Sequence, residues 1–187
     1  MIRIPPAPTV LISALALSLG CSRHIGPTRA DNLCLTNLAT LSVRLQTPLA
    51  PWSPNGESFP STLQQLVTPK TPLSVFVCPA TGHKPGPSTN IEQWTDYIYF
   101  ASQKQLLMNI PLVICPPENH GGKFGHVLWQ HIGRDRLPPD QIRALIENPW
   151  NMAANDPLDD VLVVRVPQRL QRIYTNAYTP PASSPKP

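Results

Sequence analysis

The 25 prolines of this 187-residue chain constrain its fold more than any other feature. They make up about 13% of the residues, against a typical share of about 5%. They cluster at the start, around residues 48–87, and in the C-terminal stretch TPPASSPKP. Because proline interrupts helices and central strands, we expect short elements joined by loops. We predict one compact domain over residues 31–178 and a disordered proline-rich tail over 179–187.

The first segment, MIRIPPAPTVLISALALSLGC, indicates export. Arg3 gives a weakly positive start, and an apolar run follows from Val10 to Leu19. About ten apolar residues are too few to span a bilayer but are typical of the central region of a secretory signal. The stretch LSLGC resembles the lipobox of bacterial lipoproteins. We therefore predict a signal peptide over residues 1–20, lipidation of Cys21, and a linker (SRHIGPTRA) over residues 22–30.

Two positions depart from the usual lipobox: Ser18 replaces an aliphatic residue, and Leu19 replaces a small one. The alternatives are an ordinary signal peptide that is cleaved elsewhere and an uncleaved anchor. Lipid on Cys21 would hold the protein at a membrane without spanning it. The expected location is the periplasmic face or the cell surface.

Charge and motifs argue against nucleic-acid binding and catalysis. The net charge is +4, and the only local basic cluster, Arg165, Arg169 and Arg172, lacks an aromatic platform for bases. The sequence has no Gly-x-Ser-x-Gly elbow, HExxH motif or glycine-rich phosphate loop. A Cys115–His120 nucleophile pair is conceivable, although a strand end and a turn explain both residues. We predict no enzymatic activity and no cofactor.

Periodicity predicts an α+β domain. Leu38, Leu41 and Leu45 form a helical stripe that Cys34 extends by one turn, so an amphipathic helix should run from Asp31 and end before Pro48. Apolar runs predict strands, and shorter patterns predict two more helices. We expect the first helix to pack on a small antiparallel sheet, with an additional helix and strand at the C-terminal end. The predicted strands are 73–78, 96–101, 110–115, 125–132 and 161–166, and the predicted helices are 61–67 and 140–148.

Five pieces of the sequence, in this order and spacing, resemble the pseudopilin-like exported proteins related to type II secretion pseudopilins. They are CLTNLATLSVRLQT, PNGESFPSTLQQL, VFVCPA, DYIYF and HGGKFGHVLW, and the resemblance covers roughly residues 31–133. The resemblance implies a pilin-like head with a structural or protein-interaction role. It also implies a partner in the cell envelope and a link to a type II secretion-like system.

The chain departs from that family in two ways. A lipoprotein-like signal stands where the family has a long apolar helix that packs into a filament, so the resemblance implies the head and not the fibre. The Asp-Gly turn that often ends the closing hairpin is missing, and His131-Ile132 stands near its place. A tight ligand-binding turn is therefore not expected there.

Two segments share a Cys-x4-His pattern: VFVCPATGH and LVICPPENH. If two strand ends bring them together, Cys78, His83, Cys115 and His120 form a Cys2His2 set that suits tetrahedral zinc. This is the basis of an alternative function, a periplasmic zinc-binding or hydrolytic protein. The first arm runs through a loop rich in glycine and proline, and an oxidising compartment favours disulfides, so we give zinc second place.

A disulfide that involves Cys78 is the preferred interpretation. Besides Cys21, the chain has three cysteines, so one internal bridge can form at most. Cys78 and Cys115 could pair if their strands are neighbours. The family resemblance favours Cys34 with Cys78, with Cys115 left as a buried thiol. The third possibility is that all three cysteines stay reduced.

Overall fold

The computed structural model describes residues 28–45, 59–102, 110–130, 133–148 and 162–177. The predicted signal peptide, Cys21, most of the linker and the proline-rich tail lie outside the described residues. Within the described part of the chain, no helix has both the length and the apolar character needed to cross a bilayer.

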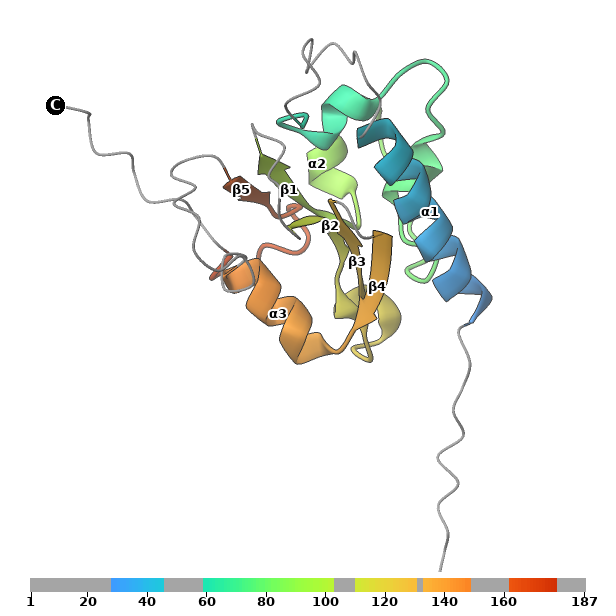
Figure 1. Cartoon of the computed structure of the whole chain (residues 1–187). Coiled ribbons are helices and arrows are strands. Elements are labelled where there is room, and N and C mark those ends of the chain that lie inside the picture. The colour runs from blue at the N-terminus through green and yellow to red at the C-terminus, as the bar shows by residue number, and fades with distance from the viewer. Residues whose placement is uncertain (1–27, 46–58, 103–109, 131–132, 149–161, 178–187) are drawn as a thin grey trace, which may run out of the picture.

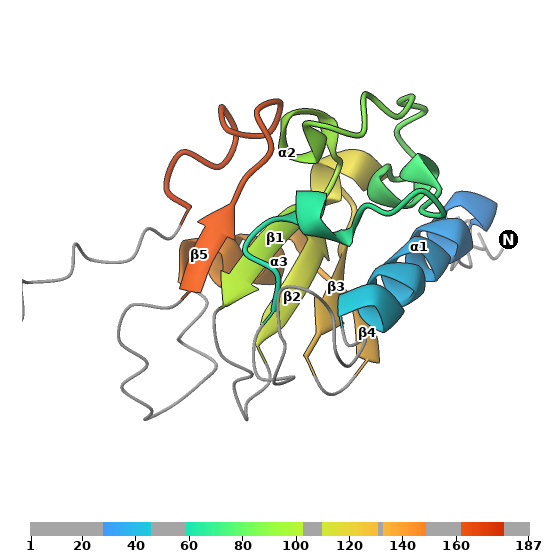
Figure 2. The ribbon, with the colours of Figure 1, turned by 90° about the horizontal axis from the view of Figure 1, so that it is seen from above.

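The domain is α+β, as predicted, and is built on a five-stranded antiparallel sheet of order β4-β3-β2-β1-β5. Figure 1 shows the sheet between helices, and Figure 2 shows β5 at one edge with α1 toward the other edge. The strands are β1 (Ile98–Ser102), β2 (Pro111–Cys115), β3 (Gly125–Trp129), β4 (Gly133–Leu137) and β5 (Leu162–Arg165).

The first helix, α1 (Arg29–Leu45), follows from its sequence pattern. Its buried stripe of Cys34, Leu38, Leu41 and Leu45 is the predicted apolar face, which explains why the helix docks on the sheet. It contacts β3, β4 and the 3-10 turn η2 (Leu73–Phe76). The remaining helical elements are α2 (Ile91–Trp94), α3 (Pro139–Glu147), η1 (Leu63–Leu66) and η3 (Pro117–His120).

Both faces of the sheet are covered by buried side chains, and β1, β2 and β3 contribute to both cores because their side chains alternate between the two faces. In β1, Tyr99 and Ala101 face the core that contains α1, and Ile98 and Phe100 face the core that contains α3. Figure 1 shows the two helices on opposite sides of the sheet. Cys115 lies on the α1 face at the end of β2, opposite His126 of β3. The side that faces α1 is therefore where the chemically interesting side chains meet.

The structure differs from the prediction in several details. The helix predicted over 61–67 is the four-residue 3-10 turn η1, and α2 was not predicted. Residues 73–78 do not form a strand: Leu73–Phe76 is a 3-10 turn after Pro72, and an extended backbone begins only at Val77. The strand GRDRL (Gly133–Leu137) was missed, since its residues are mostly charged and exposed and carry no apolar alternation. It pairs with β3 through the backbone along the edge of the sheet, and the indole N–H of Trp129 on β3 also donates to Asp135 Oδ2 at 2.8 Å.

Candidate metal centre

Three thiols and one imidazole from four separate elements meet under α1. The donor atoms of all four side chains lie within 4.8 Å of one another, and all four residues are buried. The four residues are Cys34 on α1, Cys78 after η2, Cys115 at the end of β2, and His120 at the end of η3.

The spacing of these atoms suits a tetrahedral ion. His120 Nε2 lies 3.3 Å from Cys115 Sγ and 3.7 Å from Cys78 Sγ. Zinc–sulfur and zinc–nitrogen bonds of about 2.3 and 2.0 Å would place such atoms about 3.5 Å apart in a tetrahedron. The described geometry therefore needs little rearrangement to accept zinc.

Asp31 orients the imidazole of His120. The Nδ1 atom of His120 lies 3.1 Å from Asp31 Oδ1, so its Nε2 atom is left for the sulfur cluster. Metal-binding histidines usually have such a carboxylate on the second ring nitrogen, which fixes the tautomer and the ring orientation. This contact is the feature that most distinguishes the cluster from a chance meeting of buried side chains.

The same carboxylate also caps α1. The backbone N–H of Thr28 donates to Asp31 Oδ2 at 2.8 Å, and the backbone N–H of Asp31 donates to Thr28 Oγ1 at 3.2 Å. This reciprocal pattern is that of a capping box. Although burial opposes it, hydrogen bonds from Thr28 and the neighbouring imidazole of His120 lower the pKa of Asp31 below its usual value. Asp31 is therefore held as an anion that links the helix start to the cluster.

Polar groups surround the sulfur atoms. Asn119 Nδ2 donates to Cys115 Sγ at 3.3 Å, His126 Nδ1 lies 3.4 Å from Cys34 Sγ, and Tyr97 Oη lies 3.9 Å from the same sulfur. The amide of Asn119 is a donor, and donation of this kind stabilises a thiolate in a buried site. The His126 ring also packs edge-on against His120, with a centroid distance of 4.7 Å. Burial lowers the pKa of His126 to about 4, so this imidazole is neutral near pH 7.

The surroundings shift the pKa values of the cysteine thiols in opposite directions. Hydrogen bonds from the Cys115 and Cys34 thiols lower the pKa of Cys78 well below its usual value. Burial and the neighbouring sulfurs raise the pKa of Cys115 well above its usual value. One thiolate can thus be held by the other two thiols, but three buried thiolates at this spacing require a cation. A divalent ion meets that requirement.

Three of the four residues named in the zinc prediction are in the cluster, and His83 is not. The fourth residue is Cys34. The sequence analysis did not predict it as a metal ligand, because it assigned this residue to the core or to a disulfide. The three disulfide candidates, Cys34, Cys78 and Cys115, all meet here and are free in the structure. The bridge involving Cys78 stays a prediction.

His83 belongs to a neighbouring polar network. Its side chain is 53% exposed, and its Nδ1 atom lies 3.1 Å from the fully buried Asp96 Oδ1. Arg169 forms an ion pair with the same carboxylate and also contacts His83. The backbone N–H of Cys78 and the hydroxyl of Thr81 donate to Asp96 Oδ2. Asp96 therefore ties the loop after Cys78 to the segment that follows β5.

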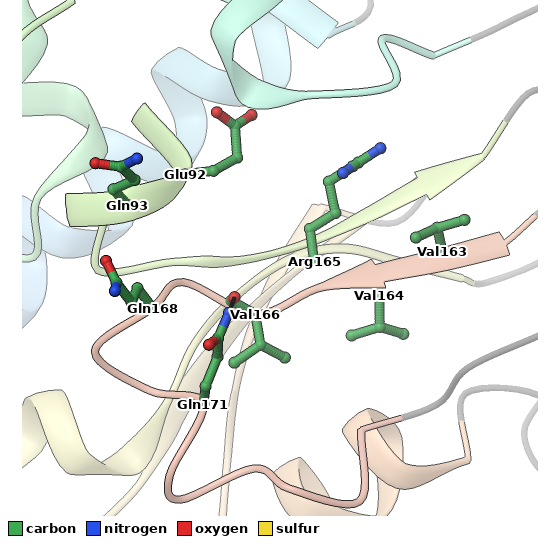
Figure 3. A pocket seen from close by; sticks show the side chains of 8 residues that line it. All are labelled: Glu92, Gln93, Val163, Val164, Arg165, Val166, Gln168 and Gln171. Carbon is green, nitrogen blue, oxygen red and sulfur yellow. Dashed lines mark hydrogen bonds between the residues drawn. The ribbon is translucent and has the colours of Figure 1, made fainter. Parts of the chain in front are cut away.

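Two cavities lie away from the clustered cysteines and histidines. Figure 3 shows a cavity along β5, lined by Val163, Val164, Arg165 and Val166 and, on α2, by Glu92 and Gln93. None of the clustered cysteines or histidines borders this cavity. An apolar cavity of about 280 Å³ lies between α3 and the β3–β4 hairpin, lined in part by Trp129 and Leu145.

The side chains of the basic cluster noted in the sequence are used separately. Arg165 donates to the backbone carbonyl of Ser61, and Arg169 donates to the backbone carbonyl of Thr95.

No family model, curated protein or solved structure matches this chain.

Proposed function

We propose that this protein binds one zinc ion through Cys34, Cys78, Cys115 and His120. The observation that carries the proposal is the contact of Asp31 with His120, which presents Nε2 of the imidazole to three thiols at ligand spacing. The donor set of three sulfurs and one nitrogen favours zinc over calcium and magnesium, which prefer oxygen ligands.

The ion would have a structural role. Four protein ligands fill a tetrahedral zinc site and leave no position for water or substrate, whereas catalytic zinc keeps one position open. The burial of all four side chains supports the same interpretation. The ligands come from α1, the loop after η2, β2 and η3, so the ion would hold the N-terminal helix and two loops against the sheet.

Elemental analysis and a count of reactive thiols test this proposal. We expect one zinc per purified chain, and thiols of Cys34, Cys78 and Cys115 that react only after a chelator is added. A disulfide between two of these residues would instead give no zinc and one thiol that reacts after denaturation. That result would replace the proposed ion with the bridge that the family resemblance implies.

We further propose that this domain is exported and tethered to a membrane by lipid on Cys21, with a structural or interaction role in the cell envelope. The signal-like N-terminal sequence and the resemblance to pseudopilin-like heads support this second proposal. Zinc ligation would also protect the three thiols in an oxidising compartment. Cys21→Ala should abolish lipid labelling and release the protein from membranes, and unchanged fractionation would contradict the tether.

A further inference from the structure

A surface cavity of about 500 Å³ lies against the two segments that carry Cys78 and His120. Ala80 and Thr81, which follow Cys78, form one side of it. Asn119 and Gly121, on either side of His120, form the other side. The cavity therefore reaches the chain immediately around the buried ligands while it remains open to solvent.

Asn119 is in contact with both the cavity and a ligand sulfur. Asn119 lines the cavity, and its Nδ2 atom contacts Cys115 Sγ at 3.3 Å. Its Oδ1 atom accepts a hydrogen bond of 3.2 Å from Arg169, which also lines the cavity. The same Nδ2 atom also donates to the backbone carbonyl of Asp96 at 2.7 Å, so a path from the cavity to Cys115 would require this amide to break both contacts and move.

His83 stands in the same cavity with a nitrogen available for a ligand. Its Nδ1 atom contacts both Asp96 Oδ1 and a guanidinium nitrogen of Arg169, which leaves Nε2 as the ring nitrogen that could bind a ligand. Glu118 adds a carboxylate to the cavity lining, and Asp96 offsets the positive charge of Arg169. A neutral imidazole in this setting can bind a divalent metal weakly before it moves inward.

We propose that zinc enters and leaves the buried centre through this cavity, with His83 as a transfer ligand; the inference rests on the proposed zinc function. Because the four final ligands are buried, the ion needs either a local path or the unfolding of the domain. His83 would bind the incoming ion, and movement of Asn119 would deliver it to Cys115 and His120. His83 of the first Cys-x4-His segment would thus bind the ion in transit, whereas His120 of the second segment would hold it in the buried centre.

Metal-exchange kinetics on the full-length, zinc-loaded chain test the proposal. Release of zinc to the coloured chelator 4-(2-pyridylazo)resorcinol and uptake by the metal-free chain are both followed by stopped flow. We expect His83→Ala to slow both rates by about tenfold and to leave the Kd for zinc unchanged. Lys84→Ala, which removes an exposed neighbour outside the cavity lining, should exchange at the wild-type rate. Free imidazole should restore the rate of the His83→Ala protein.

A second measurement requires no variant. The rate of zinc release is compared with the rate of global unfolding under the same conditions, followed by circular dichroism. Release that is faster than unfolding supports the path, and release that equals unfolding overturns it. Equal exchange rates in the His83→Ala and wild-type proteins also overturn it, even when one zinc per chain is bound. If no variant and no wild-type sample binds zinc, the proposed function itself is refuted.

Discussion

The two Cys-x4-His segments have the same spacing but different structures. In LVICPPENH, His120 turns back toward Cys115, and its Nε2 atom lies 3.3 Å from that sulfur. In VFVCPATGH, Cys78 enters the cluster while His83 stays at the surface beside Asp96 and Arg169. Equal spacing in sequence therefore does not give equal ligand sets.

A left-handed glycine adjoins the histidine of each segment, and the position of that glycine relative to the histidine explains the difference. In the second segment, η3 (Pro117–His120) coils the chain so that His120 returns over Cys115, and left-handed Gly121 (φ 63°) ends the turn afterwards. In the first segment, left-handed Gly82 (φ 67°) comes before the histidine and redirects the chain first. Glycine adopts this conformation at little cost, so each turn is set locally. The lesson is that the backbone between two ligands decides whether both reach the metal.

The largest expected effect is on stability when the metal is removed. Apparent binding free energies of structural zinc in small domains are about 10–16 kcal/mol, and binding to the folded state raises stability by mass action. We therefore expect a strong chelator to lower the Tm of the zinc-loaded chain by tens of degrees. Differential scanning calorimetry with and without chelator measures this, and re-addition of zinc should restore the Tm. An unchanged Tm would contradict a structural ion.

The next effect separates the two histidines directly. His120→Ala should lose the tightly bound zinc, because one of four ligands is removed. His83→Ala should keep one zinc per chain, because this side chain belongs to the Asp96 network. Elemental analysis after gel filtration measures both. Loss of zinc in the His83→Ala protein would show that His83 is a ligand, as in the Cys2His2 set predicted from the sequence.

A smaller effect should follow from the carboxylate beside His120. Asp31→Asn keeps the size of the side chain but weakens the control of the His120 tautomer. Loss of such a partner typically lowers metal affinity by about 10–100-fold. Competition with a chelator of known affinity measures the change.

Asp140→Asn is the matched control, since Asp140 is an exposed acid in the first turn of α3. It should leave zinc affinity unchanged. Equal affinity in the Asp31→Asn and wild-type proteins would show that the contact between Asp31 and His120 does not serve a metal.

The smallest expected effect concerns the two glycines. Gly121→Ala and Gly82→Ala each place a side chain in the left-handed region, at a cost of about 1–2 kcal/mol. Neither position is crowded, so the cost is conformational. Both variants should lose similar stability in urea unfolding, but only Gly121→Ala should also weaken zinc binding. Equal effects on affinity would remove the distinction between the two turns.

Much of the fold could be predicted because it depends on local patterns. The leucine stripe of α1, the apolar runs of β1, β2 and β3, and the helix after Pro138 all appear near their predicted positions. The edge strand β4 could not be predicted, because Arg134, Asp135 and Arg136 carry no apolar signal. Leu73–Phe76 was misread because an apolar run can be a buried turn as well as a strand.

The site was partly predictable. The shared spacing identified Cys78, Cys115 and His120, but the role of Cys34 depends on how α1 docks on the sheet. Its place on the apolar stripe showed that it faces inward and nothing more. The contact between Asp31 and His120 joins residues 89 positions apart, so only the tertiary structure could reveal it. The capping position of Asp31 was the only local signal available.

X-ray absorption spectroscopy at the zinc edge of the metal-loaded chain tests the central claim most directly. We predict three sulfur ligands at about 2.3 Å and one nitrogen ligand at about 2.0 Å. Two sulfur and two nitrogen ligands would contradict the account, because Cys34 would be excluded and a second imidazole would be required.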